Sequence, residues 1–395
     1  MKTKLTKLFM EFFDSERASG IILILCTVAS IAITHSYFGN GYSDFWHTKV
    51  GFEFGDTFSL KYSLRHWIND GLMVFFFLLI GLEIERELYV GELSNPKNAL
   101  LPIVAAIGGM VTPALLHFLL NRGTETSGGA GIPMATDIAF ALGVLALLGN
   151  RVPVSLRIFL AALAIIDDLG AIIIIALFYV GEFSLLYLFL ALGIFAGLLI
   201  LNRLGLTWLP LYLVPGFIMG CFMLKSGVHS TIAGVLLAFA IPFGRGDNKS
   251  PSYKLQHFLH KPVAFIIMPL FALANTSIAL PGNWIESLTT SNSLGIFAGL
   301  FVGKPLGIVL FSLLAVKLGL SQLPSDVFWK HFIGVGFLGG IGFTMSIFIT
   351  VLAFSNPEVV QSSKISILLS SLLAGIFGFL ILNHQTARKS NPSSV

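Results

Sequence analysis

The stretch GIPMATDIAFALG, residues 131–143, interrupts an apolar run with a proline and a carboxylate. Pro133 lacks the backbone N–H that a helix needs, and Asp137 carries a charge among aliphatic neighbours. A second stretch, GVGFLGGIGFTMSIF at 334–348, begins with five glycines in nine residues. Each glycine costs a helix about 1 kcal/mol relative to alanine. Both stretches therefore predict helices that break in the middle.

Composition places these helices in a membrane. Of the 395 residues, 55% are hydrophobic and 11% are charged, whereas soluble domains carry about 25% charged residues. A helix that crosses the bilayer needs about 20 apolar residues. That rule predicts 12 spans, centred near residues 28, 75, 110, 140, 167, 193, 216, 235, 270, 305, 342 and 373. We expect one all-α membrane domain over 1–395, with a basic segment at 1–17 and a polar tail at 384–395.

Basic residues predict the orientation. Of the 24 Lys and Arg residues, 17 fall on one side of the spans and six on the other, while Lys304 lies within a span. Cytoplasmic loops are the ones enriched in Lys and Arg, so both termini are expected in the cytoplasm. The longest outward loop contains KVGFEFGDTFSL at 49–60, in which apolar residues alternate up to a Gly55-Asp56 turn. This pattern predicts a short hairpin over about 45–60, with an amphipathic loop as the alternative.

The two predicted breaks occupy matching places in the chain. Each lies in the middle member of a three-span group, formed by spans three to five and ten to twelve, and the basic residues give these groups opposite topology. Paired interrupted segments in inverted repeats are typical of transporters whose binding site lies at the bilayer midplane. The alternative is that the Gly-rich stretch merely lets helices pack closely. Two breaks at matching places favour the transporter.

Few ionisable side chains are predicted to lie deep in the bilayer. They are Asp137, the adjacent Asp167 and Asp168 of AIIDDLGAIIII (164–175), and Lys304, with Asp70 nearer a span end. Each charge costs about 3 kcal/mol on insertion scales, so such residues are functional candidates. A structural ion pair would account for Lys304 and one acid. The other carboxylates must be protonated, hydrated or bound to a cation.

This imbalance suggests competition between a proton and a metal cation. A carboxyl group removed from water holds its proton more firmly, and a second carboxyl nearby strengthens the effect. Such a site can release its proton when a hard cation arrives, because oxygen ligands suit Na⁺ and Li⁺. Neighbours on a helix point about 100° apart, so we expect one of Asp167 and Asp168 to face an ion beside Asp137 and the other to face Lys304. Asp137 and Lys304 could also compensate the partial charges at the ends of the broken helix.

The sequence resembles the NhaA-type bacterial sodium/proton antiporters over nearly its whole length. The most specific motifs are ATDIAFALGVLALLG (135–149) and LAIIDDLGAI (163–172). Further matching segments are GLEIERE (81–87), KSGVHSTIAGVLLAF (225–239), PLFALAN (269–275), GKPLGI (303–308) and FLGGIGFTMSIFI (337–349). Antiporters of this type are a standard example of inverted-repeat transporters with broken helices.

The resemblance implies electrogenic export of Na⁺ or Li⁺ from a bacterium in exchange for protons, by alternating access across the inner membrane. It implies that Asp168 binds the cation and carries a proton, with Asp137 beside it. Asp167 would pair with Lys304, and Thr136 would lie next to the site. A homodimer, formed partly through the outward hairpin, is also implied.

Activation at alkaline pH is a further implication of the resemblance. The matching residues are Glu83 and Glu87, His257 and His260, and His229. The sequence departs from the family at Gln256, where an acid is frequent, so the pH threshold does not follow from the resemblance. A solvated helix end is the alternative for Glu83, Glu85, Arg86 and Glu87, and an ordinary hydrogen-bonding role is the alternative for His229.

Other classes of protein fit the sequence less well. An intramembrane aspartyl protease also needs two aspartates, but in Tyr-Asp and Gly-x-Gly-Asp motifs, whereas this chain has Thr-Asp and Ile-Asp-Asp. A cation channel or a sodium-coupled symporter of similar architecture is the closer alternative. We expect no enzyme activity, no resident cofactor and no nucleic-acid partner. Cys26 and Cys221 lie in apolar runs and predict neither a disulfide framework nor a metal site.

Overall fold

The structure is a computed structural model that describes residues 2–51, 53–54, 58–59, 61–181, 183–279, 282 and 284–389. Helices dominate it, as the composition predicts, and they gather into two compact units. Unit 1 comprises Met1–Ile24, Glu92–Ala171 and Leu280–Val395, and unit 2 comprises Leu25–Gly91 and Ile172–Ala279. Two helices, α1 (Lys2–Thr34) and α7 (Val154–Phe178), contain a unit boundary. Each unit is therefore assembled from separate stretches of chain.

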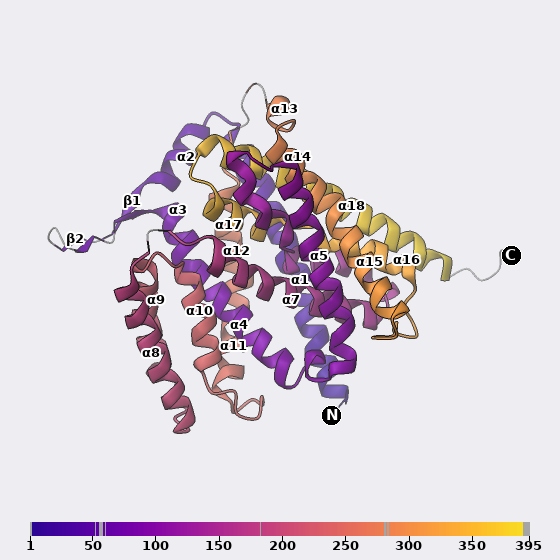
Figure 1. Ribbon diagram of the computed structural model, residues 1–395, viewed down its shortest axis with the longest axis horizontal. Helices are drawn as coiled ribbons and strands as arrows, with labels where there is room; N and C mark the ends of the chain where they lie inside the picture. Colours follow the sequence, from indigo (N-terminus) through magenta and orange to yellow (C-terminus); the bar gives the residue numbers. More distant parts are fainter. Residues whose placement is uncertain are drawn as a thin grey trace. The chain divides into compact units, whose positions relative to one another are not determined.

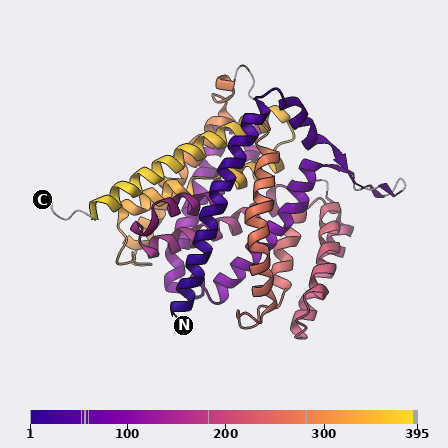
Figure 2. The same cartoon turned by 180° about the vertical axis from the view of Figure 1, so that it is seen from behind.

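Unit 1 is built around the close pair α5 (Pro96–Leu120) and α15 (Lys304–Lys317). A Cβ atom added at Gly307 would lie 2.1 Å from the backbone oxygen of Gly108, so glycine allows the two backbones to touch. Figure 2 shows the long yellow helix α18 (Pro357–Lys389) with α16 (Trp329–Gly339) beside it. The remaining elements of unit 1 are η2 (Glu92–Ser94), η3 (Glu125–Met134), α6 (Ile138–Leu147), η4 (Gly149–Arg151), α13 (Trp284–Ser287), α14 (Ser291–Ala298), η6 (Gly299–Gly303) and α17 (Phe343–Ala353).

Unit 2 is built around α10 (Ser230–Ala240), which packs against α4 (Met73–Tyr89) and α9 (Pro210–Lys225). A Cβ atom at Gly81 of α4 would lie 2.6 Å from the side chain of Ala238, so this contact also depends on a missing side chain. Figures 1 and 2 show α8 (Leu185–Arg203) and α9 side by side. The other elements are α2 (Gly39–His47), α3 (Leu64–His66), η1 (Trp67–Leu72), α11 (Pro251–Pro262), η5 (Val263–Ile267) and α12 (Met268–Asn275).

Four short strands lie between α2 and α3. β1 (Lys49–Val50) pairs antiparallel with β4 (Tyr62–Ser63), and β2 (Glu53–Phe54) pairs with β3 (Phe58–Ser59). Figure 1 shows β1 and β2 reaching away from α2 and α3. The sequence predicts a hairpin over about 45–60, and the pairing in the structure extends to Ser63. The expected Gly55-Asp56 turn lies outside the described residues, as do 390–395 of the expected polar tail.

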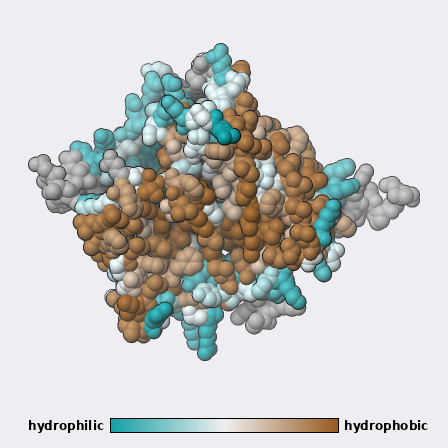
Figure 3. Space-filling model, viewed as in Figure 1, coloured by the Kyte–Doolittle hydropathy of each residue, from teal (hydrophilic) through white to brown (hydrophobic). Residues whose placement is uncertain are grey.

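Several helices are long and apolar enough to cross a membrane. Among the described residues there are seven such helices, or up to ten if each of three bent pairs counts as one span. Two shorter apolar helices, α9 and α10, come in addition. Leu185, Leu186 and Phe189 of α8 are exposed, and Figure 3 shows hydrophobic residues over much of the visible face of the molecule. Such a surface suits contact with lipid rather than with water.

The predicted interruptions of the two helices are present. One helix stops at Met134 and a new one starts at Ile138, with a bend of 43° between them. The other stops at Gly339 and resumes at Phe343, with a bend of 45°. Both pairs, η3 with α6 and α16 with α17, lie in unit 1. A third bent pair, at 114°, joins the end of α1 to α2.

Candidate functional site

The two interruptions meet in unit 1. The backbone N–H of Asp137 donates a hydrogen bond of 2.7 Å to the carbonyl oxygen of Ile341, which joins one broken segment to the other. On the next turn, the hydroxyl of Ser346 donates to the carbonyl oxygen of Ile132 at 2.7 Å. Unwinding frees backbone groups that a continuous helix would pair internally. Here those groups pair across the crossing, so the broken segments hold each other in place.

Asp137 lies at the amino ends of two helices. Its carboxylate accepts a hydrogen bond of 3.1 Å from the backbone N–H of Phe140 and so caps α6. The same carboxylate accepts from the backbone N–H of Thr344 at 3.1 Å and from the Thr344 hydroxyl, both in the first turn of α17. Helix amino ends carry partial positive charge. One buried carboxylate therefore compensates both half-helices.

Lys304 compensates two negative groups at the crossing, the Asp167 carboxylate and the carboxyl end of η3. Its Nζ lies 2.7 Å from Oδ2 of Asp167, and both side chains are fully buried. The same ammonium donates to the carbonyl oxygen of Met134, the last residue of η3, where the helix end carries partial negative charge. Lys304 directly follows the π-helical segment η6. Such segments occur frequently at functional sites.

Thr136 connects these groups. Its hydroxyl lies 2.6 Å from Oδ2 of Asp167 and 2.8 Å from the carbonyl oxygen of Gly339, where α16 ends. Asp168, the neighbour of Asp167 on α7, is also buried, and its charge acts on Lys304 as well. The Lys304 ammonium thus contacts Asp167 and interacts electrostatically with Asp168, while Asp137 is a third buried acid of this region.

The sequence-predicted residues Thr136, Asp137, Asp167, Asp168 and Lys304 all belong to this one region of unit 1. Sequence reasoning did not identify Thr344 or the carbonyl groups of Met134 and Gly339. The available signal for Thr344 was its position two residues after the last glycine of the broken stretch. Within the described residues, no group of three or more His, Cys, Asp and Glu side chains is arranged to hold a metal ion. A small cation here would therefore need backbone or hydroxyl oxygens, or water, beside the carboxylates.

Four of the residues that the resemblance ties to pH form a cluster in unit 2. Gln256 of α11 donates a hydrogen bond to Glu83 of α4. Arg86 lies 3.1 Å from Glu87, and its charge also acts on His260 of α11. His257 stacks on Tyr253 and interacts electrostatically with His260.

Glu83, and Glu85 two residues further along α4, are not at a solvated helix end. Glu83 and Glu85 are 8% and 4% exposed, so that alternative is wrong for both. Glu87 is partly buried beside Arg86. Buried acids are costly unless they are protonated or paired. Gln256 supplies such a partner to Glu83, and Arg86 supplies one to Glu87.

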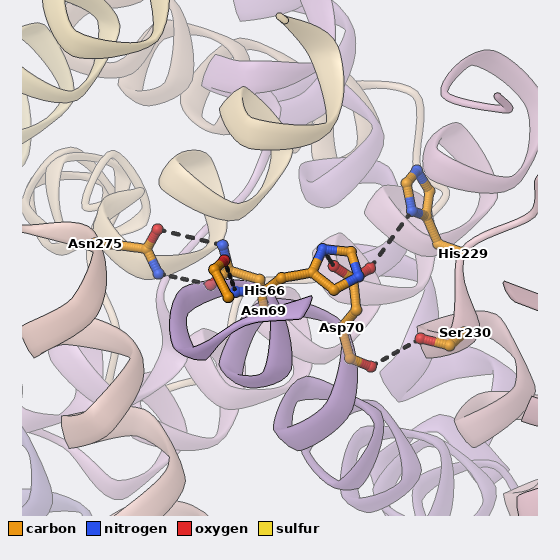
Figure 4. A network of polar contacts seen from close by, with 7 residues as sticks. His66, Asn69, Asp70, His229, Ser230 and Asn275 are labelled. Atoms are coloured by element: carbon orange, nitrogen blue, oxygen red, sulfur yellow. Dashed lines mark hydrogen bonds and ion pairs between the residues drawn. The ribbon is translucent and has the colours of Figure 1, made fainter. Parts of the chain in front are cut away.

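His229, which directly precedes α10, belongs to a different cluster. That cluster is formed around Asp70 of η1, whereas Glu83 lies further along the chain in α4. The Nδ1 atom of His229 lies 3.9 Å from Asp70, which also lies 3.3 Å from Nδ1 of His66 (Figure 4). Asp70 precedes Glu83 by thirteen residues, which is about 20 Å along a helix. The structure thus separates His229 from the other four residues of the expected pH-sensing set.

Hydrogen bonds fix the backbone around Asp70. Ser230, the first residue of α10, donates from its hydroxyl to the Asp70 carbonyl oxygen at 2.7 Å. Asn69 and Asn275 exchange amide hydrogen bonds of 2.7 and 3.4 Å, which join η1 to α12. Asp70 lies within a π-helical segment, Trp67–Leu72. Sequence reasoning identified His229 here but missed His66 and the paired asparagines.

Comparison with known proteins assigns the family. The family model described as Na+/H+ antiporter 1 matches residues 10–382. The chain belongs to this family. It is 60% identical to the Na(+)/H(+) antiporter NhaA of Flavobacterium psychrophilum, over 96% of this chain and 97% of that protein. It is 59% identical to the Na(+)/H(+) antiporter NhaA of Dechloromonas aromatica, over 97% of each chain. The relative of the same name from Aliivibrio salmonicida is 48% identical, over 96% of this chain and 98% of that one.

Membership of the Na+/H+ antiporter 1 family agrees with the resemblance seen in the motifs. Proteins of this family are transporters, so this member is not an enzyme. Together with its apolar helices, the family assignment makes the chain a multi-pass membrane protein.

Proposed function

We propose that this protein exchanges Na⁺ or Li⁺ for protons across the bacterial inner membrane, and that Asp168 and Asp137 are the groups for which cation and proton compete. The names of the relatives support sodium/proton exchange. One observation carries the assignment to these residues: three carboxylates are buried in the region of unit 1 where Lys304 supplies one ammonium. Asp167 takes the short contact with that ammonium.

In this mechanism Asp168 and Asp137 bind protons and cations in alternation. Each would hold a proton when the site faces the acidic side of the membrane and release it when a cation arrives. The Thr136 hydroxyl and the backbone carbonyl groups where the broken helices end would supply oxygen atoms of the kind that hard cations prefer. Because two acids can each carry a proton, the exchange would move more protons than sodium ions and would be electrogenic.

Alternating access would come from movement of the broken helices around this fixed site. The two bends at matching places support an inverted repeat of spans three to five and ten to twelve. Seven long helices, three bent pairs and two shorter apolar helices support the count of 12 spans. The distribution of Lys and Arg supports cytoplasmic termini.

Activation at alkaline pH would begin at the cluster of Glu83, Glu87, His257 and His260. Loss of protons there changes its net charge and so the contact between α4 and α11. His229 would respond separately, through its contact with Asp70. We also include in the proposal a homodimer that uses the strands at 49–63, where the β1–β4 pair exposes Val50.

Everted membrane vesicles with a trapped proton gradient and a pH-sensitive dye test the exchange. Adding Na⁺ or Li⁺ at alkaline pH should collapse the gradient, and Asp168→Asn should abolish this response. Asp44→Asn, which changes an exposed acid on α2, is the matched control and should behave as wild type. Purified protein in liposomes should exchange faster or slower when a membrane potential is imposed, because the reaction moves net charge.

Two outcomes would overturn the proposal. A protein that moves Na⁺ without moving protons would be a channel or a carrier of another kind. A protein that accumulates an organic solute together with Na⁺ would be a symporter. Retained exchange in Asp168→Asn would leave the family assignment intact and reject Asp168 as the binding group.

A further inference from the structure

A cavity lies away from the helix crossing, where α6 ends and α18 passes. Its volume is about 600 Å³, within the range of small-molecule sites in proteins. It lies wholly in unit 1. Its lining residues are Leu147, Leu148, Gly149, Arg151, Phe379 and Asn383.

The lining is apolar on one part and cationic on another. Leu147, Leu148 and Phe379 supply the hydrocarbon surface. A nitrogen of the Arg151 guanidinium lies 3.4 Å from Oδ1 of Asn383, so these two polar groups share one part of the wall. A guanidinium has five N–H donors and suits phosphate oxygens. None of the lining residues is acidic, so the charge of the wall is positive.

A second guanidinium lies behind the turn that forms the cavity wall. Arg157 is buried and donates to the carbonyl oxygen of Gly149. Gly149 has a φ of +60°, a left-handed conformation that a residue with a side chain rarely adopts. The bond from Arg157 therefore holds the turn in place and adds positive potential next to Arg151.

The depth of the cavity follows from the helices that form it. Leu147 is the last residue of α6, the second half of a broken apolar span. Asn383 lies near the end of the apolar span Pro357–Gln385 of α18. Two spans end at this cavity, so it lies where hydrocarbon gives way to lipid head groups. Basic pockets between spans at that level bind acidic phospholipids.

We propose that this cavity binds an anionic phospholipid, with the phosphate on Arg151 and Asn383 and an acyl chain along Phe379 and Leu147. The lipid joins the end of α6 to α18 and thereby supports the broken span that carries Asp137 at its amino end. The proposal requires a membrane protein but not the exchange reaction, because binding is measured without transport.

Thermal unfolding of the whole protein in neutral detergent micelles tests the binding. Phosphatidylglycerol should raise the midpoint temperature more than phosphatidylcholine with the same acyl chains. In Arg151→Gln the half-saturating phosphatidylglycerol concentration should rise about tenfold, because a charge-assisted contact is lost. Arg203→Gln, at the end of α8 in unit 2, is the matched control and should respond as wild type.

Leu147→Glu provides an independent check if Arg151→Gln fails to fold. Leu147 is 49% exposed, so the change is tolerated sterically, and the new carboxylate repels an anionic head group. The response to phosphatidylglycerol should then be lost. Equal stabilisation by both lipids, or an unchanged response in both variants, would overturn the proposal. So would an equal shift with inorganic phosphate alone, because the site would then bind a free anion rather than a lipid.

Discussion

Lys304 and Asp167 form a fully buried ion pair, with Nζ 2.7 Å from Oδ2, that joins α15 to α7. Removing one partner from such a pair leaves an uncompensated charge and costs on the order of 3 kcal/mol. Lys304→Ala and Asp167→Asn should each lower the midpoint of thermal unfolding. The double variant should lose less than the two single losses added together, because neither member of the pair then remains without the other. If the losses of stability in the two single variants add up to the loss in the double variant, the two side chains have no coupling energy.

Thr344 should control how well Asp137 competes for Na⁺. Thr344→Val keeps the shape of the side chain but removes a hydroxyl donor to the Asp137 carboxylate. The ionised carboxylate is then less stable, so a proton displaces Na⁺ more easily, and the half-saturating Na⁺ concentration should rise roughly three- to tenfold. Na⁺ titrations of the exchange rate at fixed pH measure this.

Thr350→Val is the matched control for that experiment. Thr350 lies on the same helix and is equally buried, but its hydroxyl donates to the carbonyl oxygen of Ser346 within α17. It should leave the Na⁺ dependence unchanged, and Thr344→Ser should restore the wild-type value. Equal effects at both positions would assign the result to packing of α17.

Gln256 should set the pH at which exchange begins. Its amide donates to Glu83, so Gln256→Glu replaces a donor with a second acid beside a buried carboxyl group. Two facing carboxyl groups lose their protons less readily, and the proposed activation follows proton loss. The pH profile should therefore move to higher pH by about 0.5–1 unit. Gln322→Glu, in an exposed loop, should leave the profile in place; a shift toward acid pH in Gln256→Glu would contradict the proposal.

The contact between Gly108 and Gly307 should be intolerant of any side chain. The Cβ atom of Gly307→Ala would lie 2.1 Å from a backbone oxygen, so α5 and α15 must separate, and α15 carries Lys304. We expect a loss of about 1–3 kcal/mol in stability and impaired exchange. Gly193→Ala on α8 meets no atom within 4 Å and should be neutral or slightly stabilising. Equal thermal midpoints for the two variants would argue against the tight crossing.

Much of the site could be predicted because the sequence marks both breaks. Pro133 and the glycines at 334–342 are poor helix residues, and the helices stop within a few positions of them. Charge predicts that Lys304 pairs with one of Asp167 and Asp168, the resemblance implies Asp167, and the structure brings those two residues together. The roles of these residues in transport stay predictions until they are measured.

Other features could not be predicted because side-chain type does not encode them. Lys304 binds the carbonyl oxygen of Met134, and every residue has such a group. The contact of His229 with Asp70 joins positions 159 residues apart, and nothing in either local sequence announces it. The burial of Glu83 and Glu85 could not be predicted, because the sequence of a charged helix end does not depend on whether another helix covers it.

The discontinuity of unit 1 has a consequence for biogenesis. Lys304 is made 137 residues after Asp167, so at about 5–20 residues per second Asp167 leaves the ribosome roughly 7–27 s before its partner. During that interval the carboxyl group of Asp167 must either carry a proton or stay hydrated as a carboxylate. Unit 2, which ends at Ala279, can be completed first, whereas unit 1 must wait for its last segment. The ion pair can therefore form only late in assembly, after the carboxyl-terminal third of the chain has been made.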